Sequence, residues 1–472
     1  MGTISDKLMR IINTKEDIRQ ALISKGYDVP TSIPFKEYAK MISDLPCRVD
    51  SFPDIEGIVA RYSALGLTNE QMAANPVWVD KTGNGHDLQM KNFAWKEGSG
   101  ISDIYPGALV FDGVDDWAGC DNLPLLPKEK GYSIIALRNW ITRYDATQYK
   151  RPLISNLDTN DEGAFLIEYG KDENVNDVTG SYNSFTDVYI DDNNPITWQT
   201  SSSYNGQIIK KGTSKSTNKL CICKTYFGQL SNYANAAIWE IVILDHDATE
   251  EELTKIKDYF VKTYPWLFPD QAWTVTGKTN EDEDRATIAN ITGNSNDLVL
   301  SNFGFVEGSG YNEEGEYAGY LVTDGVDDKV VSAESIAFTD TWTIITDTVF
   351  LGKVSVASGI LASNIFTVYN YQGSGTIAVT MGEGGSSLRV ITSSIKAFSS
   401  DGTIYDAEWN EYHVEIGTIR ALERLLKIGT SSNETSYFCQ LAFKFLGIYN
   451  NQILSKDDCI KAYNYLQTLK AK

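Results

Sequence analysis

The chain has 472 residues and carries 63 acidic against 41 basic side chains, for a formal net charge of −22. A surface this acidic repels phosphate backbones and anionic lipids, so we expect no nucleic-acid partner. No apolar run reaches the roughly 20 residues of a membrane-spanning helix, so we also expect no membrane insertion. At roughly 150 residues per domain, the length predicts about three domains.

Residues 1–46 have a helical pattern unlike the rest of the chain. Thr14 and Asp17 have the spacing of a helix cap, and the apolar stripe that follows ends at Gly26. Pro34 suits the first turn of a second helix. So short a segment buries too little apolar surface to be stable alone. We therefore predict a helical anchoring or oligomerisation domain over 1–46. The first residues lack the apolar core of a signal peptide, so we expect no secretion.

From residue 54 onward the pattern changes to short apolar segments separated by Gly, Asn, Asp and Ser. Examples are residues 108–111, 133–137, 164–169, 220–224 and 237–244. Many short strands with turn signals between them favour a sandwich or jelly roll over a sheet with crossover helices. Six cysteines are scattered along the chain, and Cys221 and Cys223 would point to one side of a strand. We expect reduced thiols and no cysteine metal cluster.

The β-rich part contains one long internal repeat. Residues 82–100 read TGNGHDLQMKNFAWKEGSG and residues 292–310 read TGNSNDLVLSNFGFVEGSG, an offset of 210 (292 − 82). The pentapeptide DGVDD follows each copy, at 112–116 and 324–328. Each copy also ends alike, in a strand, a turn and a capped helix, at 236–260 and 441–466. A single repeat at this length indicates a duplicated module. We predict a mainly β protein with one sandwich over 54–268 and a second over 269–472, each closed by a C-terminal helix.

Each pentapeptide brings three aspartates close together in sequence. Hard cations bind several oxygen ligands, so calcium is the candidate ion. The candidate metal ligands are Asp112, Asp115 and Asp116 in the first copy and Asp324, Asp327 and Asp328 in the second. The same pentapeptide also fits a hairpin turn, in which Gly adopts positive φ and Asp side chains cap the backbone. Both interpretations remain open at this point.

Differences between the copies sort the candidate ligand-binding residues. Trp117 becomes Lys329 and His86 becomes Asn296, exchanges that exposed positions accept. Trp95 becomes Phe305, which favours packing. Aromatic faces stack on the C–H faces of sugars, and exposed amides bind hydroxyls. The candidate ligand-binding residues are therefore Trp117, His86 and Asn84, the last of these in a loop that also reads as a simple turn.

Catalytic motifs are missing from the sequence. No Glu is followed two positions later by Asp, the start of the motif that glucanases of this architecture carry on one strand. The three histidines are not paired at metal-ligand spacing, and G-x-S-x-G does not occur. We therefore expect that the protein is not an enzyme.

The run WVDKTGNGHDL, followed by FDGVDDW and by a closing strand with ATEEELTKIKDYF, resembles a concanavalin A-like (laminin G-type) jelly-roll module. Its elements recur in the same order in both copies. The resemblance implies two antiparallel sheets packed as a sandwich. It also implies a fold that is often used to bind carbohydrate, often with calcium at a loop edge.

The first 46 residues resemble the short helical leader of phage tail-fibre and appendage proteins. The matching residues are Lys15, Ile18, Ala21, Leu22, Gly26, Phe35, Tyr38 and Ile42. This resemblance implies a virion fibre or appendage protein that joins other virion proteins through the leader and presents its sandwiches to host surface polysaccharide. By analogy with such fibres we expect a homo-oligomer, specifically a homotrimer. The alternatives are a bacterial cell-surface carbohydrate-binding protein and a polysaccharide-degrading enzyme.

Overall fold

A computed structural model gives the fold. It describes residues 15, 19, 52–126, 130–142, 151–157, 166–169, 194–200, 203–204, 207–208, 217–225, 227, 233–352, 358–363, 366–370, 377–381, 387–390, 392, 394–417, 423–430 and 438–471. The chain divides into two compact units, Met1–Asp54 and Ile55–Lys472. Of the first unit, residues 52–54 are described together with Lys15 and Arg19, which both lie in a helix. The rest of the predicted helical domain lies outside the described residues.

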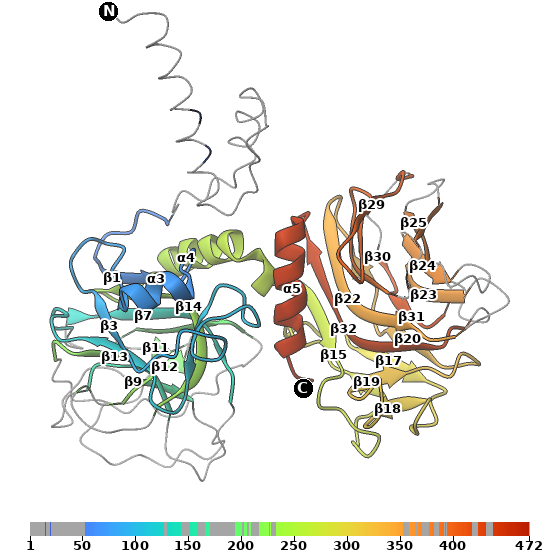
Figure 1. The fold of residues 1–472 in the computed structure, drawn as a ribbon, viewed down its shortest axis with the longest axis horizontal. Helices are drawn as coiled ribbons and strands as arrows, with labels where there is room; N and C mark the ends of the chain where they lie inside the picture. The colour runs from blue at the N-terminus through green and yellow to red at the C-terminus, as the bar shows by residue number, and fades with distance from the viewer. Residues whose placement is uncertain are drawn as a thin grey trace, which may run out of the picture. The chain divides into compact units, whose positions relative to one another are not determined.

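The first half of Ile55–Lys472 contains two antiparallel sheets (Figure 1). The larger has eight strands. In order they are β12 (Gln207–Ile208), β11 (Ser203–Tyr204), β10 (Ile196–Thr200), β7 (Ser133–Trp140), β14 (Asn235–Leu244), β5 (Leu109–Asp112) and β4 (Gly100–Ile101), with β1 (Ile58–Ser63) also paired to β14. The smaller has six strands, in the order β2 (Val77–Trp78), β3 (Leu88–Lys91), β6 (Trp117–Cys120), β13 (Leu220–Ile222), β8 (Arg151–Ser155) and β9 (Leu166–Tyr169).

The second half contains two further eight-stranded sheets and a small two-stranded one. The first sheet has the order β18 (Gly310–Asn312), β19 (Tyr320–Val322), β32 (Leu441–Asn450), β22 (Trp342–Phe350), β27 (Ile395–Ser399), β28 (Thr403–Asp406) and β29 (Glu411–His413), with β15 (Gln271–Thr274) also paired to β32. The second has the order β16 (Thr287–Ile288), β17 (Leu298–Ser301), β20 (Lys329–Ser332), β31 (Lys427–Ile428), β23 (Ser358–Ser363), β24 (Phe366–Asn370), β25 (Ile377–Met381) and β26 (Ser387–Val390). The pair is β21 (Ile336–Ala337) with β30 (Glu423–Arg424).

The two halves share one strand order. β4, β5, β14, β7 and β10 occupy the places of β18, β19, β32, β22 and β27, and β1 occupies the place of β15. Even an irregularity recurs, because the pairing of the central strands skips Trp239 in β14 and Lys444 in β32. A bulge leaves one residue unpaired and bends the strand. The prediction of a mainly β protein built from two sandwiches is confirmed, and the repeat in the sequence is a repeat in the fold.

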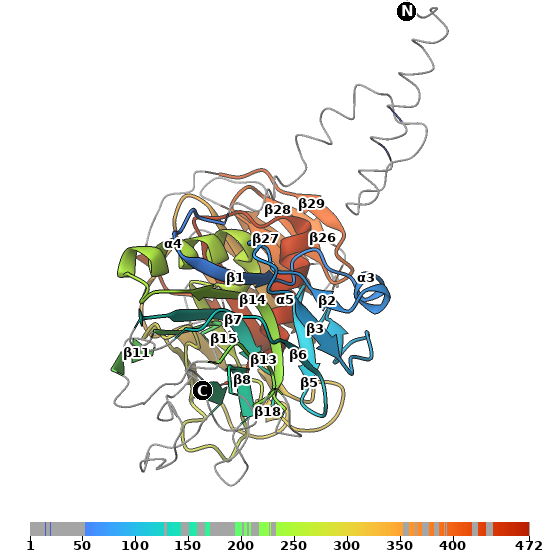
Figure 2. The ribbon, with the colours of Figure 1, turned by 90° about the vertical axis from the view of Figure 1, so that its left-hand side faces the viewer.

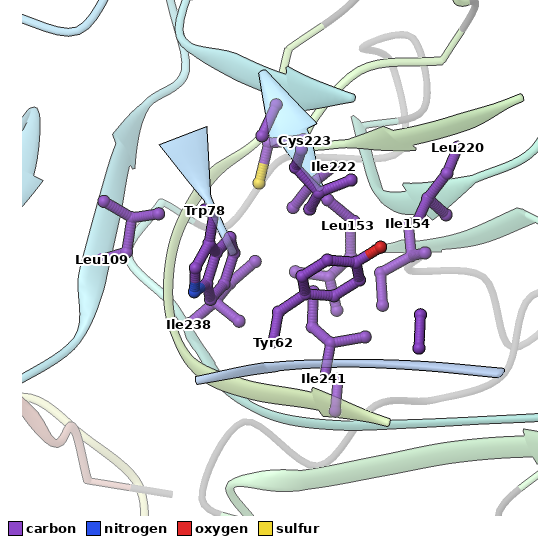
Figure 3. Packing of buried hydrophobic residues seen from close by; sticks show 14 of the residues in the cluster. Tyr62, Trp78, Leu109, Leu153, Ile154, Leu220, Ile222, Cys223, Ile238 and Ile241 are labelled. Atoms are coloured by element: carbon purple, nitrogen blue, oxygen red, sulfur yellow. The ribbon is translucent and has the colours of Figure 1, made fainter. Parts of the chain in front are cut away.

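Alternating strand residues build one apolar core inside each sandwich. In the first, Figure 3 shows the ring of Tyr62 among aliphatic side chains that include Leu153, Ile154 and Ile241. Trp273 stands at the corresponding place of the second core, opposite Leu446 of β32.

Each half ends in a capped helix, as predicted. Thr249 and Glu252 form the capping box of α4 (Glu250–Thr263), and Ser455 caps α5 (Lys456–Thr468). A short helix, α3 (Asn69–Ala74), precedes β2, and a 3-10 turn, η2 (Pro265–Leu267), follows α4. No helix in the described part of the chain is both long enough and apolar enough to span a membrane.

The closing helix of the first half is held to its sheet by a buried ion pair. The α4 helix lies against the sheet beside β1 and β14 (Figures 1 and 2), and Arg61 of β1 and Glu240 of β14 contact residues of this segment. Arg61 Nε donates to Glu240 Oε1 at 2.6 Å, and Arg61 Nη2 donates to the hydroxyl of Tyr259 on α4 at 2.7 Å. The hydroxyl of Tyr264, just after α4, donates to Glu240 Oε2 at 2.7 Å. Arg61 and Glu240 are only 5% and 0% exposed.

At the corresponding positions the second half has apolar side chains instead of the ion pair. The register places Ala272 where Arg61 stands and Phe445 where Glu240 stands. The Phe445 ring packs against Tyr463 of α5, with ring centroids 5.1 Å apart. Gly447 of β32 lets Leu466 approach closely, since an added Cβ would lie 2.8 Å from Leu466 Cδ1.

Removing one partner of the ion pair will destabilise the first half. Glu240→Ala leaves the buried guanidinium of Arg61 without its carboxylate, so we expect a loss of about 3–5 kcal/mol in unfolding free energy, measured by urea denaturation. The double variant Arg61→Ala with Glu240→Phe, which copies the second half, should regain much of that loss. A double variant as unstable as the single one would contradict this account.

Candidate functional site

The DGVDD loop of the first half crosses from one sheet to the other. It leaves β5 of the larger sheet at Asp112 and enters β6 of the smaller at Trp117. Asp112 Oδ1 accepts the backbone N–H groups of Val114, Asp115 and Asp116 at 2.8, 3.2 and 3.3 Å. Asp116 Oδ2 in turn accepts the N–H of Asp112 at 3.1 Å. The loop is therefore a turn capped by its own carboxylates, as the turn interpretation predicted.

The second half repeats this loop bond for bond. Asp324 Oδ1 accepts from Val326, Asp327 and Asp328 at 2.7, 3.3 and 3.4 Å. Asp328 Oδ2 accepts from Asp324 at 2.8 Å. The loop is also tied from outside in both halves, because Asn92 and Asn302 each donate to the carbonyl of the central aspartate, Asp115 and Asp327, at 2.9 Å.

The last aspartate of each loop is a buried carboxyl with one oxygen left over. Asp116 and Asp328 are both fully buried, and the Oδ1 atom of each has no hydrogen-bond partner. Burial raises the pKa of each carboxyl to about 6. The hydroxyls of Ser99, beside Asp116, and Ser309, beside Asp328, act in the opposite direction and lower the pKa. An ionised carboxylate is costly in such a place unless something positive compensates it.

The three carboxylates of each loop also converge. One oxygen from each of Asp112, Asp115 and Asp116 lies within 4.8 Å of the others, and the same holds for Asp324, Asp327 and Asp328. The unbonded, buried Oδ1 atom of the last aspartate suits a hard cation, and water could supply the remaining ligands of calcium.

Asn84 and His86 have mainly structural environments. The amide of Asn84 donates to the carbonyls of Ile58 and Val59, at 3.3 and 2.9 Å, and so ties its loop to β1. Asn294 does the same with the carbonyl of Asp270 at 2.6 Å. We expected exposed side chains at His86 and Trp117, and both are half-buried instead. The Nδ1 atom of His86 is enclosed without a hydrogen-bond partner.

Trp117 remains a candidate binding residue. Its neighbours Ala118 and Cys120 point into the core, so Trp117 and Gly119 lie on the outer face of the smaller sheet. The indole is half-buried. Lys224 Nζ lies 4.0 Å from the centroid of the ring, and Phe227 meets the indole edge-on at 5.8 Å. Gly119 makes room for both rings, because an added Cβ would lie 2.8 Å from Trp117 Cζ3.

The lysines of this outer face were not predicted from the sequence. Lys224 is 6% exposed, and Lys219 lies over the ring of Phe227 at 5.0 Å. Cys221 and Cys223 do not share a face as we predicted. Cys223 joins the core cluster and Cys221 does not, because Cys223 has a φ of 57° that turns the chain at this point. The same turn leads into Lys224, and an irregular residue of this kind has no reliable sequence signal.

The predicted ligand-binding residues do not form one site. Trp117 pairs with Lys91, at one end of the β3–β6 ladder. At the other end, Asn122 donates to the carbonyl of Gly85, beside His86. The aspartates of the pentapeptide, by contrast, immediately precede Trp117 in the sequence.

The corresponding face of the second half differs. Its register matches Val330 and Ile428 with Ala118 and Ile222, which places Lys329 at the position of Trp117. By the same register Thr430 corresponds to Lys224 and Val331 to Gly119. The pentapeptide is therefore constant between the halves while the face beside it changes.

No family model matches the chain, and no curated protein matches it. Similar solved structures include a Trypanosoma rangeli sialidase in complex with sialic acid, at 11% identity and a TM-score of 0.29, covering 50% of this chain and 41% of that chain. Another structure of Trypanosoma rangeli sialidase has 9% identity and a TM-score of 0.29, covering 58% and 48%. A mutant of HCR/D has 9% identity and a TM-score of 0.30, covering 84% and 98%. The chain thus spans less than half the length of these sialidases.

One prediction is corrected by these matches. Sialidases are enzymes, and their presence among the matched structures contradicts our expectation that the chain is not an enzyme. That expectation came from missing sequence motifs, which cannot detect carboxylates that meet across strands. With TM-scores below 0.5, no active-site residue or ligand is transferred from these structures to this chain.

Proposed function

We propose that the protein is a phage virion fibre or appendage protein whose sandwiches adhere to glycans on the host surface. The resemblance of residues 1–46 to a fibre leader supports attachment to other virion proteins and a homotrimer. The two antiparallel sheets in each half support the concanavalin A-like assignment, in which paired sheets offer faces and loop edges to carbohydrate.

The observation that carries glycan adhesion is the outer face around Trp117. A half-buried indole beside a lysine and next to a polar loop offers an apolar face for sugar C–H groups and polar groups for hydroxyls. The first half is therefore the glycan-binding half, since Lys329 replaces the indole in the second. Several chains on one fibre would raise a weak affinity by avidity.

We further propose that the pentapeptide loops bind calcium. Asp112, Asp115 and Asp116 would hold the ion in the first half, and their equivalents in the second. The ion would offset the buried charge of Asp116 and fix the loop next to Trp117. The fit rests on the unbonded Oδ1 atom of Asp116, repeated at Asp328.

Trp117→Ala should weaken glycan binding at least about tenfold, or about 1.4 kcal/mol, because it removes the stacking surface. A glycan array screened with intact protein identifies the ligands, and calorimetry measures the loss. The matched control is Lys329→Ala, at the same position of the second half, which should change affinity little. Equal effects of the two substitutions would contradict the assignment of the site to the first half.

The protein should be found in purified phage particles. Mass spectrometry of density-purified virions should detect it, and antibodies against Ile55–Lys472 should label an appendage by electron microscopy. Recovery from a bacterial outer-membrane fraction and not from particles would instead favour a bacterial cell-surface carbohydrate-binding protein.

Calcium should stabilise the protein more at pH 7 than at pH 5. The pKa of Asp116 and of Asp328 is raised to about 6, above the usual value for an aspartate. Without calcium, these groups therefore stabilise the fold as pH falls through 6, and at pH 5 protons compete with the ion. Calcium at a hundredfold its dissociation constant adds about 2.7 kcal/mol at one site.

The measurement is the calcium-dependent shift in Tm at the two pH values. Asp116→Asn and Asp328→Asn should each remove part of the shift at pH 7, and together nearly all of it. A shift that persists in the double variant would place the ion elsewhere.

A further inference from the structure

We propose that the outer face of β6 and β13 recognises acidic sugars, with Lys224 and Lys219 binding a carboxylate or sulfate group while Trp117 stacks on the ring that carries it. This inference rests on the proposed glycan adhesion and specifies the class of glycan.

Lys224 is a buried cation without a matching anion. Its side chain packs on Trp117 and lies 5.9 Å from the ring of Tyr233. Among the residues that the structure describes, no carboxylate oxygen lies within 4.0 Å of its Nζ, and no hydrogen bond to that atom occurs. Burial lowers the pKa of Lys224, so its ammonium lacks compensation in the protein. Cation–π contact with Trp117 offsets part of this cost and leaves the three N–H donors unused.

Lys219 adds a second positive charge to the same face. Its Nζ lies over the ring of Phe227, and this ring contacts Trp117 edge-on. The two lysines therefore flank a pair of aromatic rings. Its carboxylate neighbour is Asp121, 3.8 Å away and with a side chain 68% exposed. An ion pair this long and this exposed contributes little and yields readily to a better anion.

The sign of the charge is what makes the face selective. The chain carries a net charge of −22, so an acidic polymer is repelled by most of the surface. Two lysines on a face with aromatic rings form a local exception, complementary to a sugar that is apolar on its ring and negative at its edge. In the second half, Lys329 and Thr430 occupy the places of Trp117 and Lys224, so the ring and the cation are not combined in this way.

The test uses the full chain and two pairs of polymers that share a sugar backbone and differ in charge. Polygalacturonate is compared with its methyl ester, and dextran sulfate with dextran, by calorimetry at low and high salt. We expect at least one charged polymer to bind about tenfold more tightly than its neutral counterpart, and the preference to fall with salt. The pair that shows it identifies carboxylate or sulfate as the recognised group.

Lys224→Met should abolish the preference for charge and Lys224→Arg should keep it, with Lys329→Met as the matched control in the second half. Thermal unfolding of each variant verifies the fold. Equal binding of charged and neutral polymers, or binding of neither, overturns this inference. If Trp117→Ala leaves all glycan binding unchanged, the proposed adhesion site itself fails. If Trp117→Ala weakens glycan binding but charged and neutral polymers bind equally, the adhesion site stands and only the preference for acidic sugars is contradicted.

Discussion

Each sandwich depends on one long strand whose two edges must both be hydrogen-bonded. β14 pairs with β7 along one edge, and on the other edge β5 takes residues 235–238 while β1 takes 240–244. A buried backbone group left unpaired costs free energy comparable to a lost hydrogen bond, so both short strands must return to β14. β32 divides its edge in the same way between β19 and β15. This constraint fixes where the chain between the two short strands can run, and it places the DGVDD loop at the seam between the sheets.

Contacts that satisfy the backbone groups of the strands recur in both halves, whereas contacts on the outer faces of the sheets differ. Asn69 and Asn280 each exchange two hydrogen bonds with the backbone of one strand residue, Ile101 and Tyr311, at 2.8–2.9 Å. Such bonds satisfy backbone groups that no ladder reaches, so replacing either asparagine would leave them unpaired. The sheet faces are freer, because a pair of contacting side chains can be replaced by another pair. Arg61 and Glu240 of the first half are replaced in this way by Ala272 and Phe445 in the second half.

The sequence predicted what is local or repeated, and it failed where a side chain's environment comes from far along the chain. Strand positions, the cap at Thr249 and the turn at Asp112 follow from neighbouring residues. The contact between Trp117 and Lys224 joins residues 107 apart (224 − 117), and no spacing rule reaches it. His86 misled for a related reason. The replacement of His86 by Asn296 in the second copy suggested an exposed position. The contact at His86 is made by its backbone carbonyl, which accepts a hydrogen bond from the Tyr62 hydroxyl, and any side chain at this position would allow it.

Asp116 carries a charge that the turn does not need. The turn uses Asp112 as its cap and a single oxygen of Asp116 as an acceptor. An asparagine would supply that oxygen without the cost of burying a charge, although its amide N–H2 could not accept a hydrogen bond from the Ser99 hydroxyl. Both halves nevertheless keep aspartate, with Oδ1 unbonded in each, although their neighbouring faces have diverged. A cation between the three carboxylates would remove that cost, so the buried Asp116 and Asp328 support the proposed metal binding independently of any resemblance to a known fold.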